Sequence, residues 1–307
     1  MQTVLIAGGT GFVGKHLVAL LLQQGFAVHI LSRNKDAAQK NTANTRFFYW
    51  NPETGEYDAA AFAGAEYLVN LGGAGVADKR WTPAYKQQII SSRTQSIQLL
   101  AKALDSTPNN ILTVVSASAT GWYGSDTEAS VSRGGFTETD APADTFFGHT
   151  CKQWEEAADL FRSNGKRLTI LRIGIVLHPD GGMLKEILKP LRFGIATVLG
   201  RKNRMLSWIK MEDMCRLIVY ALQEKKVEGV YNAVAPQPAT NGELVTAVAR
   251  KYNKFFIKMP VPAFMIKLIA GEFSNELLNS VTVNSKKIQE AGFSFLYHDI
   301  ENAFRRN

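Results

Sequence analysis

The chain has little cysteine and no long apolar run. Its 307 residues include two cysteines, Cys151 and Cys215, and neither belongs to a C-x-x-C pair. This composition excludes a disulfide-stabilised scaffold and favours a reducing compartment. Every apolar run is interrupted well short of the ~18 residues that a membrane span needs, and the first residues lack the basic stretch of a secretion signal. We therefore expect a soluble, cytoplasmic protein with no membrane partner.

Charge of one sign is not concentrated in any part of the sequence. The 35 Lys and Arg residues stand against 27 Asp and Glu, a net charge of +8, and the basic residues are dispersed apart from short clusters such as Lys225-Lys226. Dispersed basic residues favour a solvated surface with some phosphate-binding positions over a nucleic-acid partner. The five histidines form no i,i+4 pair and have no neighbouring ligand cluster, so we predict no metal site.

What the sequence does contain, close to its start, is a phosphate-binding pattern. The apolar run 4–7 is typical of a buried parallel strand and leads into glycines at positions 8, 11 and 14. Apolar residues at helical spacing follow, and the run 27–32 is typical of the next strand. In such a strand, turn, helix, strand unit the glycines let the backbone approach a pyrophosphate at the helix N-terminus. The unit predicts a dinucleotide site rather than a merely structural turn.

The end of the second predicted strand indicates which dinucleotide is bound. An NAD-specific site usually has an acidic residue there, which holds the ribose 2′-hydroxyl. This chain has Ser32, Arg33 and Asn34 instead. A hydroxyl and a guanidinium suit a 2′-phosphate, although an Arg at a strand end is often simply solvated. We predict NADP as the cofactor.

The α/β pattern continues along the chain. Further strands are expected at 46–49, 66–70, 111–115 and 168–174, with a long helix at 83–104. The small residues that follow strand 66–70 suit either a cofactor-binding loop or a flexible one. Arg93 shares the apolar stripe of the long helix, where it would meet a cofactor phosphate or an ordinary ion-pair partner. We predict a Rossmann-type, doubly wound parallel sheet with a smaller C-terminal substrate domain.

Several motifs give the chain a specific resemblance. They read GGTGFVG, SRN, NLGGAGVADKRW, SSR, SASATGWYG, LRIGIVL and SWIKMED, and they are spread over nearly the whole sequence. With them the chain resembles the extended and atypical short-chain dehydrogenase/reductases, and within these the NAD-dependent epimerase/dehydratase-like subfamily. The resemblance implies that Ser118 polarises the substrate oxygen. The cofactor-binding residues that the motifs and the resemblance indicate are Gly8, Thr10, Gly11, Phe12, Val13, Gly14, Ser32, Arg33, Asn70, Leu71, Gly72, Arg93, Ser116, Ile173, Gly174 and Ile175.

One departure from the family's pattern affects the chemistry. The catalytic Tyr and Lys that the family spaces as Y-x-x-x-K fall here on Phe147 and Cys151. A phenyl ring cannot transfer the proton that accompanies hydride movement, and Lys152 would point about 100° away around a helix. Tyr123 is a candidate donor, although in relatives a Tyr at that place often only lines the pocket. We expect Cys151 to be a buried helix residue rather than a nucleophile.

Two functions remain open on this reasoning. The first is an NADP(H)-dependent oxidoreductase or epimerase-like enzyme that acts on a small or sugar-like molecule. The second is a catalytically silent NADP(H)-binding sensor, which the residues at positions 147 and 151 would permit.

The expected domains are 1–175 for the cofactor and 176–307 for the substrate, with a segment at about 205–235 returning to the first domain. The resemblance implies a C-terminal extension of unknown function from about residue 255. Its apolar residues Phe264, Met265, Leu268 and Ile269 would cover the substrate pocket, form a dimer surface or pack in the core. The chain is expected to be a monomer or a homodimer.

Overall fold

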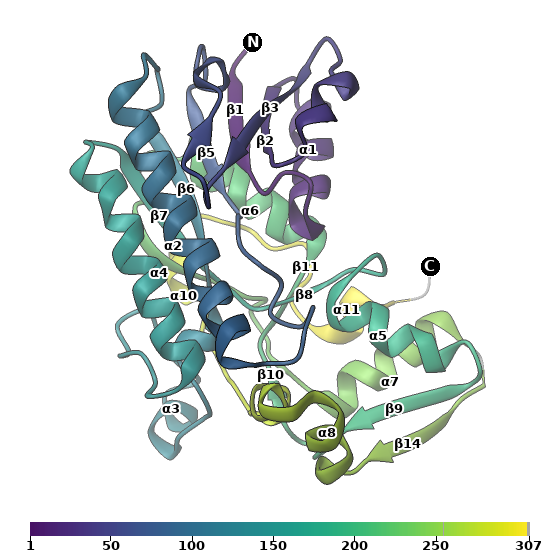
Figure 1. Cartoon of the computed structure of the whole chain (residues 1–307). Coiled ribbons are helices and arrows are strands. Elements are labelled where there is room, and N and C mark those ends of the chain that lie inside the picture. Colours follow the sequence, from purple (N-terminus) through teal and green to yellow (C-terminus); the bar gives the residue numbers. More distant parts are fainter. Residues whose placement is uncertain (254, 306–307) are drawn as a thin grey trace.

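An eight-stranded sheet forms the larger of two lobes in the computed structural model, which describes residues 1–253 and 255–305 (Figure 1). The strand order is β12-β7-β6-β5-β1-β2-β3-β4, and every neighbouring pair is parallel except β3 with β4. The strands are β1 (Thr3–Ala7), β2 (Ala27–Ser32), β3 (Thr45–Asn51), β4 (Glu56–Tyr57), β5 (Tyr67–Asn70), β6 (Thr113–Ala119), β7 (Arg167–Ile173) and β12 (Gly229–Ala233). The predicted Rossmann-type parallel sheet is confirmed.

Helices cover both faces of this sheet because its central strands bury apolar side chains on both sides. Along β1, Val4 and Ile6 pack with α1 (Phe12–Gln23) and α6 (Met211–Gln223). Leu5, which points the other way, packs with α2 (Pro83–Ser106) and α4 (Phe146–Ser163). Successive side chains of a strand face opposite sides, so one short apolar run supplies two core layers. Figure 1 shows α2 and α4 side by side over one face.

The smaller lobe has its own core around Trp208 and Leu244. It comprises α5 (Gly182–Leu191), β9 (Ile195–Leu199), α7 (Asn241–Tyr252), β14 (Ile257–Val261), α8 (Ala263–Ala270) and α11 (Ile300–Ala303). The chain enters this lobe through β8 (Ile175–Leu177) and returns through β11 (Trp208–Lys210), and these two strands pair with each other. The return then supplies α6 and β12 to the larger lobe.

Short elements complete the described chain. They are η1 (Lys35–Lys40), η2 (Ala59–Ala61), η3 (Thr120–Trp122), α3 (Glu128–Ser132), β10 (Met205–Leu206), β13 (Ala239–Thr240), η4 (Gly271–Phe273), α9 (Ser274–Leu278) and α10 (Lys286–Glu290). None of the helices in the described chain combines the length and the apolar character that crossing a bilayer takes.

The C-terminal extension contacts both lobes. Its η4 reaches the start of α2, where Lys86 Nζ lies 2.5 Å from Glu272 Oε1 and the rings of Trp81 and Phe273 are 5.3 Å apart. The four apolar side chains named above on α8 are largely exposed, at 70, 43, 77 and 76% of their surface. They do not pack in the core of the described chain, so the expected alternatives that remain are a pocket cover or a dimer surface.

Candidate functional site

The glycine-rich turn between β1 and α1 is built by close backbone contact. Gly8 has a φ of +84°, a region that favours glycine, and its carbonyl accepts a hydrogen bond from Gly11 N at 3.0 Å. A Cβ on Gly14 would lie 2.2 Å from that same carbonyl oxygen. The helix N-terminus is therefore held against the strand end, and Thr10 and Gly11 are exposed beside it. Backbone N–H groups and the helix dipole at such a turn favour an anion, so this turn fits a cofactor pyrophosphate.

The end of β2 lies next to this turn, because β2 pairs with β1 in parallel. Ser32 is buried, and its Oγ accepts a hydrogen bond from Asn34 N at 3.2 Å. Arg33 is exposed, so its guanidinium is free to meet a ligand at the sheet edge. The Asn34 side chain caps η1 by accepting from Asp36 N at 2.9 Å. The loop is thus locally ordered, with a cation at the position where a 2′-phosphate is expected.

Asn70 organises the loop after β5, on the other side of β1. It is fully buried, its Nδ2 lies 3.3 Å from Ser116 Oγ, and its Oδ1 accepts from Gly72 N at 3.3 Å and from Ser96 Oγ at 3.4 Å. Leu71 N in turn donates to Ala7 O at 2.9 Å. Asn70 therefore joins the carboxyl ends of β5 and β6, which is the edge where open parallel sheets bind cofactors. The predicted residues 70–72 and 116 lie together here.

Arg93 supports the same loop from α2. Its Nη1 donates to Ala74 O at 3.1 Å and to Ile89 O at 2.8 Å, and its guanidinium lies 4.7 Å from the centre of the Trp154 ring. Burial lowers the pKa of this group. These partners are carbonyls and a ring rather than a carboxylate, so the structure does not show the ordinary ion pair that the sequence allows. Contact between Arg93 and a cofactor phosphate stays a prediction.

Ser118 and Tyr123 belong to a buried polar cluster beneath this edge. Ser118 Oγ donates to Glu155 Oε1 at 2.6 Å, and Glu155 accepts two further bonds from Arg172, at 2.8 and 2.9 Å. Arg172 also donates to Tyr123 Oη at 3.0 Å, and that hydroxyl donates to Asn232 Oδ1 at 2.6 Å. Burial is the main reason why the pKa of Tyr123 lies above its ordinary value. Both hydroxyl protons are therefore engaged inside the protein, an arrangement that favours a structural role for Tyr123.

The two positions where the resembled pattern has Tyr and Lys carry no group that titrates near neutral pH. Phe147 is half-buried, and its ring packs against Trp81 with centroids 5.0 Å apart at 86°. Cys151 is 1% exposed, its Sγ lies 3.6 Å from Ala119 O, and burial raises the pKa of its thiol to about 12. Lys152 is exposed and lies 3.8 Å from Glu156, so it does not replace the missing cation.

Gly174 separates β7 from β8 at the same edge of the sheet. Gly174 N donates to Ala233 O at 3.2 Å, and Ile175 N donates to Ser207 O at 2.9 Å. Residues 173–175 therefore lie where the larger lobe meets the entry to the smaller one. Together with the turns after β1 and β2 and the residues predicted on β5 and β6, they lie at the carboxyl-end edge of the parallel sheet, whereas Arg93 reaches this edge from α2.

Sequence reasoning missed Arg204, which is 6% exposed in the smaller lobe. Its Nη1 donates to Asn279 O at 3.2 Å, but its Nε and Nη2 have no hydrogen-bond partner among residues 1–253 and 255–305, and burial lowers its pKa to about 10. A cavity of about 320 Å³ beside it is lined by Ala263, Leu278 and Ser280 of the extension. In the sequence Arg204 stands in a short basic run, Arg201 to Arg204, which gave no sign that one member is buried.

Comparisons with known proteins agree with this geometry. A family model described as the NAD dependent epimerase/dehydratase family matches residues 4–233, and one described as a domain of unknown function, DUF1731, matches residues 261–306. The chain is 32% identical to an epimerase family protein of Mycobacterium bovis, over 98% of this chain and 95% of that protein. It is also 32% identical to the epimerase family protein YfhF of Bacillus subtilis, over 98% of this chain and 96% of that protein.

Solved structures show the same likeness. The human epimerase family protein SDR39U1, solved with NADPH, superposes with a TM-score of 0.83 at 26% identity and covers 99% of this chain and 98% of its own. The UDP-glucose 4-epimerase of Thermus thermophilus, solved with NAD, gives a TM-score of 0.76 at 19% identity over 98% of this chain and 96% of its own, a likeness of fold alone.

Proposed function

The chain belongs to the NAD dependent epimerase/dehydratase family, and from that premise we propose that it is an NADP(H)-dependent oxidoreductase or epimerase-like enzyme. Its substrate is a small or sugar-like molecule. The observation that carries the proposal is the glycine turn, in which Gly14 leaves no room for a Cβ and the N-terminus of α1 faces the exposed Thr10 and Gly11. The related human structure solved with NADPH supports a nicotinamide dinucleotide in this place.

The residues at the end of β2 favour the phosphorylated cofactor. Arg33 offers an exposed guanidinium and Ser32 a buried hydroxyl, and no carboxylate follows them until Asp36, in the first turn of η1. A carboxylate would hold a ribose hydroxyl but repel a 2′-phosphate, whereas a guanidinium fork binds a phosphate with charge-assisted hydrogen bonds. We therefore assign NADP(H), as the sequence predicts.

The positions of the residues around the cofactor site suggest a role for each of them. When bound, NADPH supplies a hydride. Asn70 holds the loop beside the cofactor, and Ile173 and Ile175 flank it. Neither Phe147 nor Cys151 can supply a proton near neutral pH, because one has none to give and the pKa of the other is about 12. The proton at the substrate oxygen then comes from water or from the substrate itself.

The surroundings of Arg204 indicate that the substrate carries a negative charge. A buried guanidinium with two unpartnered nitrogens is costly, and an anion in the adjoining cavity would satisfy both nitrogens. Three residues further along the chain, Ser207 O accepts from Ile175 N, which joins the segment that carries Arg204 to the entry of the smaller lobe. We propose a substrate with a carboxylate or phosphate group that reaches Arg204.

A second function, an NADP(H) sensor without turnover, is favoured by one specific observation. The hydroxyl of Ser118 is bonded to Glu155, so the expected polarising residue and both members of the Tyr-Lys pair are withdrawn from proton transfer. The two functions differ in one measurable respect, because only the enzyme oxidises its bound cofactor.

The test is a fluorescence titration with NADPH and NADH, followed by turnover assays with carbonyl and sugar-nucleotide substrates that carry an anionic group. We expect NADPH to bind at least tenfold more tightly than NADH, and Arg33→Ala to remove most of that preference. Arg46→Ala, which removes an exposed cation from the neighbouring β3, serves as the control and should leave it intact. Equal affinities for the two cofactors would refute the NADP assignment. Tight binding without oxidation of any substrate would favour the sensor.

A further inference from the structure

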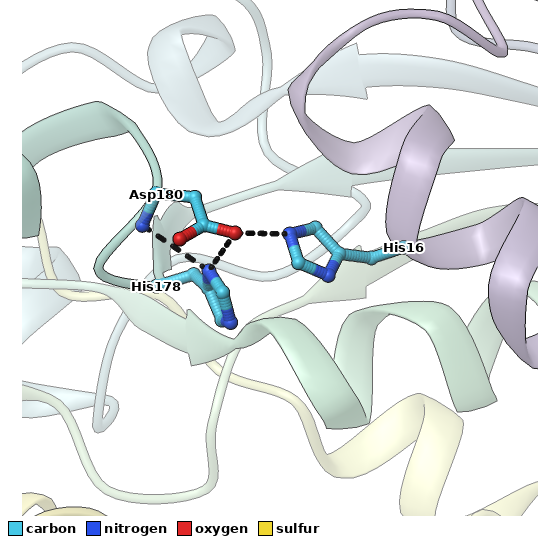
Figure 2. A group of neighbouring side chains, drawn as sticks. All are labelled: His16, His178 and Asp180. Carbon is cyan, nitrogen blue, oxygen red and sulfur yellow. Dashed lines mark hydrogen bonds and ion pairs between the residues drawn. The ribbon is translucent and has the colours of Figure 1, made fainter.

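Two histidines and an aspartate meet where the two lobes join. His16 lies on α1, two residues after Gly14, whereas His178 and Asp180 lie in the loop between β8 and α5. Figure 2 shows the Asp180 carboxylate facing both imidazole rings. The three residues offer two nitrogens and one oxygen, all within 4.8 Å of one another.

The distances approach those of a metal-binding set. Asp180 Oδ2 lies 3.5 Å from His16 Nε2 and 3.5 Å from His178 Nδ1. Ligand atoms in a tetrahedral zinc site with bonds of about 2.0–2.1 Å are roughly 3.3 Å apart. Small side-chain rotations would bring the imidazole nitrogens of His16 and His178 to this separation. The side chains have room to rotate, because both imidazoles are half-buried and the Asp180 carboxylate is 67% exposed.

Backbone contacts hold the loop of His178 and Asp180 against α1. The loop is pressed onto α1 so closely that a Cβ on Gly181 would lie 2.5 Å from the Phe12 ring. Gly181 N donates to His178 O at 3.3 Å, which closes the turn around Asp180. Asp180 N donates to His178 Nδ1 at 3.3 Å, and this nitrogen is consequently in the unprotonated form that a metal ion requires. A metal ion would replace that hydrogen bond.

We propose that His16, His178 and Asp180 bind a divalent transition-metal ion of the zinc class. Two imidazoles and a carboxylate suit zinc, and three protein ligands leave a fourth position to water or to an anion. The ion would tie α1 of the larger lobe to the loop that enters the smaller lobe, one helical turn from the expected pyrophosphate site. The absence of a metal was predicted from ligand spacing, and spacing cannot reveal ligands that stand 162 positions apart in the sequence.

The experiment measures Zn²⁺ and Co²⁺ binding to the chelator-treated, tag-free protein by calorimetry and, for Co²⁺, by visible absorption. The variants are His16→Ala, His178→Ala and Asp180→Asn, each checked for its fold by circular dichroism. The matched control is His149→Ala, because His149 Nε2 also lies close to a carboxylate, 2.7 Å from Asp144 Oδ1, but has no second imidazole.

We expect one equivalent of Zn²⁺, affinity reduced at least tenfold in each variant, and less than a twofold change in His149→Ala. We also expect Co²⁺ to give a visible spectrum that the three variants lose. The proposal is overturned if the native chain does not bind Zn²⁺, if the folded variants bind it as tightly, or if the control loses as much affinity as they do. Cofactor binding does not enter these measurements, so their outcome is independent of the proposed function.

Discussion

Substitution of Glu155, which pairs with Arg172 in the interior, tests whether the buried polar cluster stabilises the fold. Both side chains are almost fully buried, at 9% and 3% exposure, and they are joined by two hydrogen bonds of 2.8 and 2.9 Å. Replacing Glu155 by Ala leaves the guanidinium of Arg172 and the hydroxyl of Ser118 without their partner. Removing one member of a buried ion pair typically costs about 3–5 kcal/mol.

We expect the free energy of unfolding of Glu155→Ala to fall by that amount. Arg172 keeps Tyr123 Oη, Glu138 O and the face of the Trp122 ring as partners, which places the expected value near the lower end. Glu155→Gln retains an accepting oxygen but loses the charge, so its loss should be smaller, about 1–3 kcal/mol. At roughly 2 °C per kcal/mol for a chain of this size, the Ala variant should melt about 6–10 °C below the native protein.

The measurement is urea unfolding followed by tryptophan fluorescence, together with thermal melting. The neighbouring Glu156 provides the control, because it lies on the same helix but is exposed and pairs with Lys152 at 3.8 Å. Glu156→Ala should change stability by no more than about 0.5 kcal/mol. A loss below about 1 kcal/mol in Glu155→Ala, or equal losses in the two variants, would refute the view that this cluster is a buried, mutually dependent network.

Three further predictions follow from single residues. Gly14→Ala, whose Cβ would lie 2.2 Å from Gly8 O, should lose about 1–3 kcal/mol of stability and most cofactor binding; Lys15→Ala is its control, and unchanged titration of NADPH would contradict the prediction. Cys151 and Cys215 have pKa values raised by burial from 9.0 to about 12, so iodoacetamide at pH 8 should alkylate the native protein about a thousandfold more slowly than the urea-unfolded chain; similar rates would count against the burial of both thiols. Arg204→Met should keep or raise the melting temperature in chloride and abolish any stabilisation by phosphate, and a drop of several degrees in chloride would show that Arg204 serves the fold instead.

Local patterns were enough to predict the parallel sheet, and they also carry the prediction of where the cofactor binds. Each buried strand is a continuous apolar run, and the glycines stand at fixed positions after the first of them, so both signals lie within a few residues of sequence. Strand β14 was not predicted, because Ile257, Lys258 and Met259 are exposed and belong to no buried apolar run. Its pairing with β9 defines it.

The chemistry of the site could not be predicted to the same depth, because it depends on contacts between distant segments. Nothing in the sequence around Glu155 indicates its partners, and only the fold shows that it is paired with Arg172, buried, and bonded to the predicted Ser118. Arg204 and the His16, His178 and Asp180 group are likewise assembled from separate segments. No periodicity in the sequence distinguishes such residues from solvated ones.

The electrostatic surroundings of position 151 bear on why a cysteine stands there. Besides burial, the charge of Glu155 raises the pKa of the Cys151 thiol and the charge of Arg93 lowers it, so both ions lie near the sulfur. A lysine at this position would bring a second cation beside Arg93, which is itself buried against Trp154 and donates to the carbonyls of residues 74 and 89. Two like charges in a buried site repel strongly. A neutral thiol at position 151 therefore avoids this repulsion and is compatible with an Arg93 that supports the loop after β5.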